Sequence, residues 1–339
     1  MLGEDPGVAD LLAKVRQGLA RLPKHIGAAP RTRPAGWTRG DSMPTARNSL
    51  LAATIGGRLF VVGGHDGKGD SPVLEVYDPA TDSWRRLAAL PKVDSGNAGR
   101  YGGAVGVIDG KLYLAGGWRI RPPIPTRSLL IYDPGTDRWR RGANMPTLSA
   151  CSVAGVIRRR LYVLTACDGH SGFRKSLHVY DPDRNAWSRL RDARHAHADA
   201  AVGVIGGKLY VAGGGEWGKP TPALEVYDPG TNRWSAKAPM SAVRAGAAAG
   251  VIDGKLYVVG GSIGKKLLAT LEIYDPATNG WRTGPPMPSG RSSLAAAVIG
   301  RRLYAVGGYD GKRCLGLLEV FRPGAVSRTL RIPRVRNPR

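Results

Sequence analysis

The 339-residue sequence contains no apolar run near the ~20 residues that a transmembrane helix needs, which argues against a membrane span. Its first residues, MLGEDPGVAD, carry acids where a signal peptide carries bases, and no apolar segment follows them. Cysteine is also scarce, because three residues without CxxC spacing are too few for a disulfide framework. These absences predict a cytoplasmic protein that makes no use of a membrane.

Acidic residues are outnumbered, since 26 of them stand against 50 lysines and arginines and leave a formal net charge of +24. Such an excess of positive charge favours acidic partners or polyanions and says nothing about the fold. Glycine, in contrast, is abundant, and its 48 residues are about twice the usual share.

Many of the glycines belong to an internal repeat. The phrase VIDGKLYVVGG at residues 251–261 returns in similar form as VIDGKLYLAGG, VIGGKLYVAGG and TIGGRLFVVGG. In five copies a YDP landmark follows and then a tryptophan: Trp84, Trp139, Trp187, Trp234 and Trp281. These tryptophans are 47 or 48 residues apart, with one gap of 55. A fixed period of this length indicates a repeat architecture.

Within one copy the pattern predicts four short β-strands. Asp253-Gly254 suits a type I′ turn between two apolar runs, YDP ends a third strand, and the tryptophan lies in a fourth. About six such units predict an all-β, six-bladed propeller, which protects its sheet edges by closing into a ring. A glycine pair, YDP and tryptophan at this period resemble the kelch repeat over roughly residues 37–323, and the resemblance implies a kelch-type β-propeller.

The first and last copies are both incomplete, and they complement each other. Trp37 lies 47 residues before Trp84 but follows no glycine pair, whereas the copy that ends at Pro323 has no tryptophan after it. We therefore predict that the strand around Trp37 is the outermost strand of the sixth blade, a closure that the kelch resemblance also implies. The alternative is that SRTLRIP, after Phe321, forms this strand.

Three regions are expected along the chain. Residues 1–33 are an N-terminal amphipathic helix and a linker, residues 34–323 the propeller, and residues 324–339 a basic tail. The apolar residues of the expected helix recur at helical spacing: Leu11, Leu12, Val15, Leu19 and Leu22. We expect a monomer, and the tail and total charge make polyanion binding a further alternative.

A second regularity places one residue at a fixed distance before the end of each hairpin phrase. The six residues are Arg47, Arg100, Ser149, His197, Arg244 and Arg291. They begin the inner strands around one mouth of the channel, which the kelch resemblance implies is the recognition face. Because guanidinium groups make bidentate bonds to carboxylates, we predict that they bind an acidic segment of a partner protein. The alternative is a structural role, in which they bind backbone carbonyl groups between blades.

The loops after the glycine pairs should line the same mouth. They add these candidates for partner binding: His65, Trp118, Arg119, Trp217 and Tyr309. Aromatic residues and arginine dominate binding hot spots, although the aromatic residues could instead cover loop backbone. The favoured function is therefore a non-catalytic protein-interaction module.

An enzyme is the main alternative. Some six-bladed kelch propellers that this sequence resembles are sialic acid mutarotases, which implies an isomerase acting on sugar acids. Glu216 would then be the catalytic acid, with Arg244 or Arg291 beside it.

No cofactor and no metal are expected. His195, His197 and Asp199 alternate along one strand and could in principle hold a metal ion. Three ligands from one strand make a poor tetrahedral site, however, so ordinary rim residues are the favoured interpretation.

Overall fold

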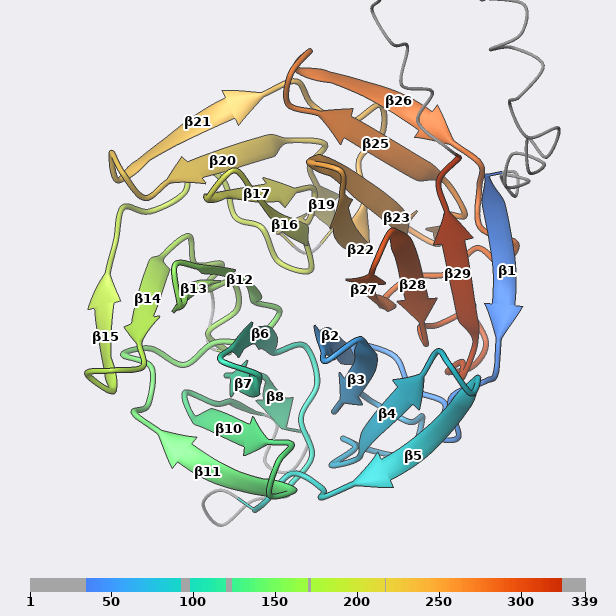
Figure 1. Cartoon of the computed structure of the whole chain (residues 1–339). Helices are drawn as coiled ribbons and strands as arrows, with labels where there is room; N and C mark the ends of the chain where they lie inside the picture. The colour runs from blue at the N-terminus through green and yellow to red at the C-terminus, as the bar shows by residue number, and fades with distance from the viewer. Residues whose placement is uncertain (1–34, 93–97, 120–123, 170–171, 217, 325–339) are drawn as a thin grey trace, which may run out of the picture. The chain divides into compact units, whose positions relative to one another are not determined.

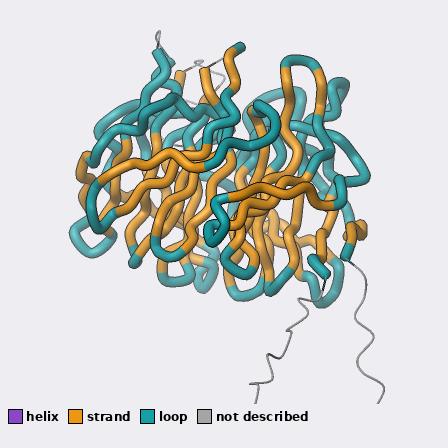
Figure 2. The backbone as a smooth tube through the Cα atoms, turned by 90° about the horizontal axis from the view of Figure 1, so that it is seen from above, coloured by secondary structure: helices purple, strands orange, loops and turns teal. Residues whose placement is uncertain are grey.

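The computed structural model describes residues 35–92, 98–119, 124–169, 172–216 and 218–324, and the expected N-terminal helix and basic tail lie outside them. The compact unit Ala35–Pro323 consists of six four-stranded antiparallel blades around a central channel (Figure 1). Figure 2 shows the ring turned by 90°, with loops at both ends of the strands. The prediction of an all-β, six-bladed propeller is confirmed. Within the described ranges, no helix has the length and apolar character needed to cross a membrane.

From the channel outward, blade one consists of β2 (Leu51–Ile55), β3 (Arg58–Val62), β4 (Leu74–Asp78) and β5 (Ser83–Leu87), and blade two of β6 (Ala104–Ile108), β7 (Lys111–Ala115), β10 (Leu129–Asp133) and β11 (Arg138–Gly142). Blade three consists of β12 (Val153–Ile157), β13 (Arg160–Leu164), β14 (Leu177–Asp181) and β15 (Ala186–Arg189), and blade four of β16 (Ala201–Ile205), β17 (Lys208–Ala212), β20 (Leu224–Asp228) and β21 (Arg233–Lys237). Blade five consists of β22 (Ala245–Ile252), β23 (Lys255–Ile263), β25 (Leu271–Asp275) and β26 (Gly280–Gly284), and blade six of β27 (Ala295–Ile299), β28 (Arg302–Val306), β29 (Leu318–Arg322) and β1 (Gly36–Gly40). Loops add β8 (Trp118–Arg119) with β9 (Ile124–Pro125), β18 (Gly215–Glu216) with β19 (Lys219–Pro220), and β24 (Lys266–Leu267) on β23.

The N-terminal strand closes the ring, as the tryptophan spacing predicts. β1 pairs antiparallel with β29, and Trp37 lies opposite Phe321 with their ring centroids 5.2 Å apart. The indole N–H of Trp37 donates to the carbonyl of Pro285 in the connection that leaves blade five. The outermost position of blade six is therefore filled by the N-terminal segment and not by residues after Phe321.

The hydrophobic core lies between the blades, not in the centre of the ring. Six clusters each combine residues of two neighbouring blades, so every blade-to-blade interface is apolar. The inner strands approach closely: a Cβ on Gly203 would lie 2.6 Å from a methyl of Leu256 and 2.7 Å from one of Val251 in the next blade. Glycine and alanine dominate these strands because larger side chains would force the blades apart.

At one end of the blades, ion pairs join the second and third strands. The turn between the inner strands has the predicted geometry, with φ of 51° at Asp253 and 70° at Gly254. The basic residue that opens the second strand then pairs with the aspartate of the YDP landmark: Arg58–Asp78, Lys111–Asp133, Arg160–Asp181, Lys208–Asp228 and Lys255–Asp275. We call this end the turn face, and the opposite end, where the loops after the glycine pairs emerge, the loop face.

Hydrogen bonds attach each outer strand to the preceding blade, and we call this contact the outer clip. In blade three, the indole N–H of Trp187 donates to the carbonyl of Ala143, and Asn185 Oδ1 accepts from the amide of Ala143 and the hydroxyl of Tyr180. Asn185 has a φ of 49°, a left-handed conformation that Asn and Asp tolerate best among side-chain-bearing residues. The same position in other blades is Asp82, Asp137, Asn232 or Asn279. The tryptophan and YDP landmarks of the repeat are thus parts of one interblade contact.

We predict that Trp37→Ala destabilises the whole ring, because Trp37 joins β1 to Phe321 and to the neighbouring blade. Complete loss of a buried tryptophan costs about 3–5 kcal/mol, and since Trp37 is partly exposed we expect about 2 kcal/mol. The measurement is urea unfolding followed by tryptophan fluorescence. Thr38→Ala, on the exposed face of the same strand, is the matched control. Equal midpoints for the two variants would contradict this role of Trp37.

The aspartates of the outer clips predict part of the acid sensitivity. The hydroxyl groups of Tyr77 and Tyr132 donate to Asp82 and Asp137 and hold the pKa of each carboxyl below its ordinary value of 3.8. A depressed carboxyl pKa contributes stability that is complete above pH 3.8 and is lost as the pH falls through the folded-state value. At pH 7 the Asp82→Asn/Asp137→Asn variant should be less stable than the wild type, because it lacks the carboxylates whose depressed pKa contributes stability at that pH. It should lose less of its thermal midpoint between about pH 4 and pH 2. Parallel acid dependence of the two proteins would disprove the assignment.

Candidate functional site

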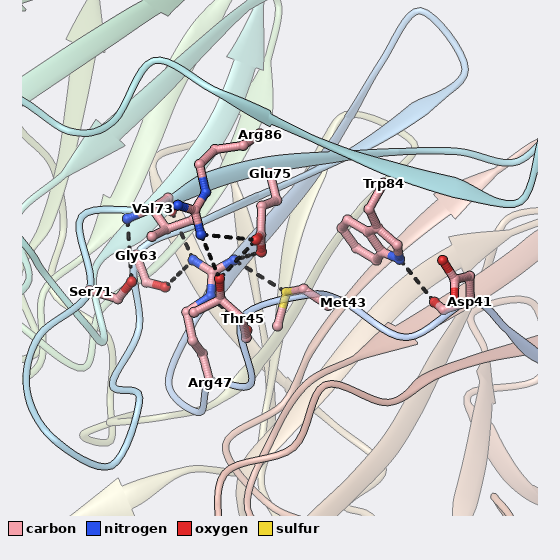
Figure 3. A network of polar contacts seen from close by, with 10 residues as sticks. All are labelled: Asp41, Met43, Thr45, Arg47, Gly63, Ser71, Val73, Glu75, Trp84 and Arg86. Carbon is pink, nitrogen blue, oxygen red and sulfur yellow. Dashed lines mark hydrogen bonds and ion pairs between the residues drawn. The ribbon is translucent and has the colours of Figure 1, made fainter.

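An arginine–glutamate ion pair lies inside blade one at its loop-face end. Nη2 of Arg47 is 2.7 Å from Oε2 of Glu75, and Nη1 donates to the carbonyls of Gly63 at 2.7 Å and Val73 at 2.8 Å. Figure 3 shows the guanidinium enclosed by these groups, with Thr45 hydrogen-bonded to the second carboxylate oxygen. The pair fixes the incoming connection to the glycine pair and to β4.

Blades five and six repeat this pair as Arg244–Glu272 and Arg291–Glu319. Burial lowers the pKa of all three arginines, to about 10 for Arg47, while the adjacent glutamate opposes the shift. The arginines remain charged at neutral pH. Each pair is therefore a buried charge pair whose two members depend on each other.

The expectation that these arginines bind a partner's carboxylate is corrected by their burial. The relative exposures are 0% for Arg47, 2% for Arg100, 1% for Arg244 and 0% for Arg291. In blade two, Leu130 replaces the glutamate, and Arg100 donates instead to the hydroxyl groups of Thr126 and Ser128. The geometry supports the alternative in which the arginine is structural and binds backbone carbonyls and the third strand of its own blade.

Blades three and four carry altered versions of the pair. In blade three, Ser149 and His178 replace both charged residues, and burial lowers the pKa of His178, which favours its neutral form. In blade four, His197 replaces the arginine, with Nε2 3.0 Å from Oε2 of Glu225 and Nδ1 2.8 Å from the carbonyl of Gly213. Both ring nitrogens of His197 thus take positions that guanidinium nitrogens take elsewhere.

Two residues further along, the connections form a ring of backbone hydrogen bonds around the channel. The residues with left-handed φ at this position are Ser49, Gly102, Cys151, Asp199, Gly246 and Ser293. Amide-to-carbonyl bonds of 2.7–3.4 Å link each blade to the next at this level. The ring surrounds a cavity of about 240 Å³, lined mainly by alanine and glycine of the inner strands. Asp199 is the acidic residue of this lining, and burial raises the pKa of its carboxyl.

The loop residues singled out by the sequence differ in exposure. His65, Trp118 and Tyr309 are partly exposed, Glu216 is exposed, Arg119 is buried, and Trp217 lies outside the described residues. Trp118 and Phe173 pack over a small cluster that contains the buried, free Cys151 and Cys167. Partner binding by the exposed members of this set stays a prediction.

Two features of the loop face were not assigned to the site from the sequence. The first is the glutamate of the third strand, which follows its arginine by 28 residues in blades one, five and six. The second is a set of exposed lysines in the loops after the glycine pairs: Lys68, Lys219, Lys265, Lys266 and Lys312. Both could have been found by aligning the six copies, since the glutamate recurs in register and the lysines occupy one type of loop.

The blade architecture and the repeated clips define a kelch-type β-propeller. The family model described as "KLHDC2/KLHL20/DRC7 Kelch-repeats domain" matches residues 150–327, and "Kelch motif" matches residues 46–91 and 99–146. The chain belongs to the kelch-repeat family.

Curated relatives match part of this chain. It is 28% identical over 176 residues to "Kelch-like protein 35" of Mus musculus, a match that covers 40% of this chain and 29% of that protein. It is 32% identical over 125 residues to "Kelch-like protein 36" of Bos taurus, covering 36% and 19%, and 26% identical over 133 residues to "Beta-scruin" of Limulus polyphemus, covering 38% and 14%. The chain thus spans less than a third of the length of these relatives.

A solved structure titled "Structure of YjhT" superposes with a TM-score of 0.72 at 20% identity. The superposition covers 84% of this chain and 98% of that chain. At this identity the likeness shows the propeller fold.

The buried pairs predict a specific mutational pattern. Glu272→Leu leaves the Arg244 charge buried without a counterion and should lower the unfolding free energy by about 3–5 kcal/mol. Arg244→Met/Glu272→Leu removes both charges, as blade three does with Ser149 and His178, and should be more stable than the single variant. Urea unfolding of the wild type and both variants checks this. A double variant no more stable than Glu272→Leu would show that the ion pair is not the cause.

Proposed function

We propose that this propeller is a non-catalytic protein-interaction module that binds an acidic segment of a partner protein on its loop face. The observation that carries the proposal is the set of exposed loop lysines defined above, in blades one, four, five and six. Membership of the kelch-repeat family, to which the relatives named Kelch-like proteins also belong, supports an interaction role.

Backbone pairing supports a shared face for the lysine loops and the connections into the inner strands. Isolated β-bridges join the two sets of loops in successive blades: Asn48 with His65, Tyr101 with Trp118, Ala150 with Cys167, Ala198 with Gly215, and Ser292 with Tyr309. A segment bound over the channel mouth would therefore contact residues from both sets.

The charges of the two faces are arranged differently. On the turn face, the basic residue that opens the second strand is neutralised by the YDP aspartate in five blades. Across the ranges that the structure describes, no ion pair within 4.0 Å involves the loop lysines, whereas the loop carboxylates of Asp66 and Asp310 accept amide hydrogen bonds of their own loops. Positive charge that is not held in an ion pair attracts carboxylates and speeds their association.

The geometry gives less support to the mutarotase-like alternative. That reading requires Glu216 beside Arg244 or Arg291, but both arginines are buried against Glu272 and Glu319. Among the residues with described side chains, Glu216 has no ion pair with either arginine. A monomeric state and a cytoplasmic location remain predictions.

Charge reversal on the loop face tests the proposal. We expect Lys68→Glu/Lys265→Glu/Lys266→Glu/Lys312→Glu to weaken binding of a fluorescent, Asp/Glu-rich peptide by at least about tenfold at low salt. Fluorescence anisotropy measures the affinity, and circular dichroism checks the fold.

The matched control changes the same number of charges on the outer strands. Arg85→Glu/Arg140→Glu/Arg233→Glu/Arg282→Glu alters exposed residues of β5, β11, β21 and β26 and should change the affinity by no more than about threefold. If both variants lose peptide equally, and heparin competes as well as the peptide, total charge governs binding and the loop-face proposal fails.

A further inference from the structure

Blade four brings a second histidine to its altered charge pair. Ligand atoms of His195, His197 and Glu225 all lie within 4.8 Å of one another. Nε2 of His197 is 3.0 Å from Oε2 of Glu225, and Nδ1 of His195 is 3.5 Å from Oε1. Ligands at 2.0–2.1 Å from one tetrahedral metal are about 3.3 Å apart, so the two histidine–glutamate separations suit a shared cation.

The hydrogen bonds of His197 require a proton or a cation between its Nε2 and Glu225. Nδ1 lies 2.8 Å from the carbonyl of Gly213, which can only accept, so Nδ1 carries a proton. In a neutral imidazole the lone pair of Nε2 would then face a carboxylate oxygen of Glu225 at 3.0 Å. Either a second proton or a metal ion must lie between them. Donation of the other ring N–H to a backbone carbonyl is the arrangement that orients metal-bound histidines.

Glu225 offers an unused ligand atom. Its side chain is fully buried, and Oε1 has no hydrogen-bond partner, while Oε2 accepts from the amides of Arg194 and His195. In blade one the equivalent oxygen of Glu75 accepts from the hydroxyl of Thr45. One oxygen of the buried carboxylate is therefore available to coordinate a cation.

His195 distinguishes blade four from the other blades. It occupies the position of Thr45, two residues before the arginine position, where the other blades have Thr, Ala or Ser. Its side chain is 55% exposed, so the cluster is reached from solvent on the loop face. An ion can therefore reach the buried imidazole and carboxylate past the exposed imidazole of His195.

We propose that His195, His197 and Glu225 bind a divalent transition metal of the zinc(II) class. Two imidazoles and one carboxylate suit zinc, whereas calcium and magnesium prefer oxygen ligands throughout. The third ligand is Glu225 of β20 and not Asp199, the third residue of the sequence pattern. The ligands therefore come from two segments, and the objection that three ligands from one strand make a poor tetrahedral site no longer applies. The site is independent of the lysine-based proposal and leaves a fourth position open on the loop face.

Zinc titration of chelator-treated, tag-free protein tests the site. Isothermal titration calorimetry with zinc chloride alone should show saturable binding at about neutral pH, where histidine nitrogens are free to coordinate. His195→Ala removes an exposed ligand without disturbing the buried pair and should weaken zinc binding by at least about tenfold. Zinc should raise the thermal midpoint of the wild type and not of this variant. Cobalt(II) should give a visible absorption band that His195→Ala lacks.

The matched control is His65→Ala, a histidine on the loop face outside the cluster, which should bind zinc like the wild type. Because His195→Ala keeps all three cysteines, loss of binding in it identifies the cluster and not a thiol site. The proposal is overturned if the wild type takes up no zinc at about 100 µM, since His197 and Glu225 are then only a proton-bridged pair. It is equally overturned if His195→Ala binds zinc as tightly as the wild type.

Discussion

A four-stranded blade cannot cover its own apolar faces, and the rest of the structure depends on this constraint. Each hydrophobic cluster combines residues of two neighbouring blades, so no blade is complete until the next one is in place. Closure by β1 makes the two ends of the propeller segment depend on each other, because Trp37 covers Phe321 nearly three hundred residues later. The close approach of neighbouring inner strands at Gly203 and the outer clip at Trp187 both keep the apolar faces of neighbouring blades in contact.

The loop-face end of each blade creates a second problem, which is electrostatic. The carbonyl of the residue in the glycine-pair position points inward, and a buried carbonyl needs a donor. Arg47 supplies that donor and then needs a buried anion, which Glu75 provides. Blade three lacks both charged residues, and blade four keeps the glutamate and has a histidine in place of the arginine. Blade two keeps the arginine, and the hydroxyl groups of Thr126 and Ser128 accept from it where the glutamate is replaced. An arginine is permanently cationic, but an imidazole must obtain its positive charge from a proton or a metal ion.

The sequence predicts the closure well and the burial of the arginines poorly, for a physical reason. Closure depends on spacing along the chain, and the 47 residues from Trp37 to Trp84 place the first strand in register with the others. Burial depends on where a side chain points, which the period does not specify. A repeated arginine at a channel mouth is consistent with an exposed binding residue on the rim or with a buried ion pair. The recurring glutamate 28 residues later is the signal that separates the two, because a repeated opposite charge indicates an internal partner.

The side chains that recur at the same position in several copies of the repeat therefore already make contacts within the propeller. Arg244 is held by Glu272, and a residue held in this way cannot also serve a partner. Residues that bind a ligand or a partner must therefore lie at positions where the copies of the repeat differ and where the side chain reaches solvent. His195 meets both conditions because it stands where blade one has Thr45, and the lysines of the loops after the glycine pairs meet the second. In a propeller built from near-identical blades, the departures from the repeat distinguish one channel mouth from another.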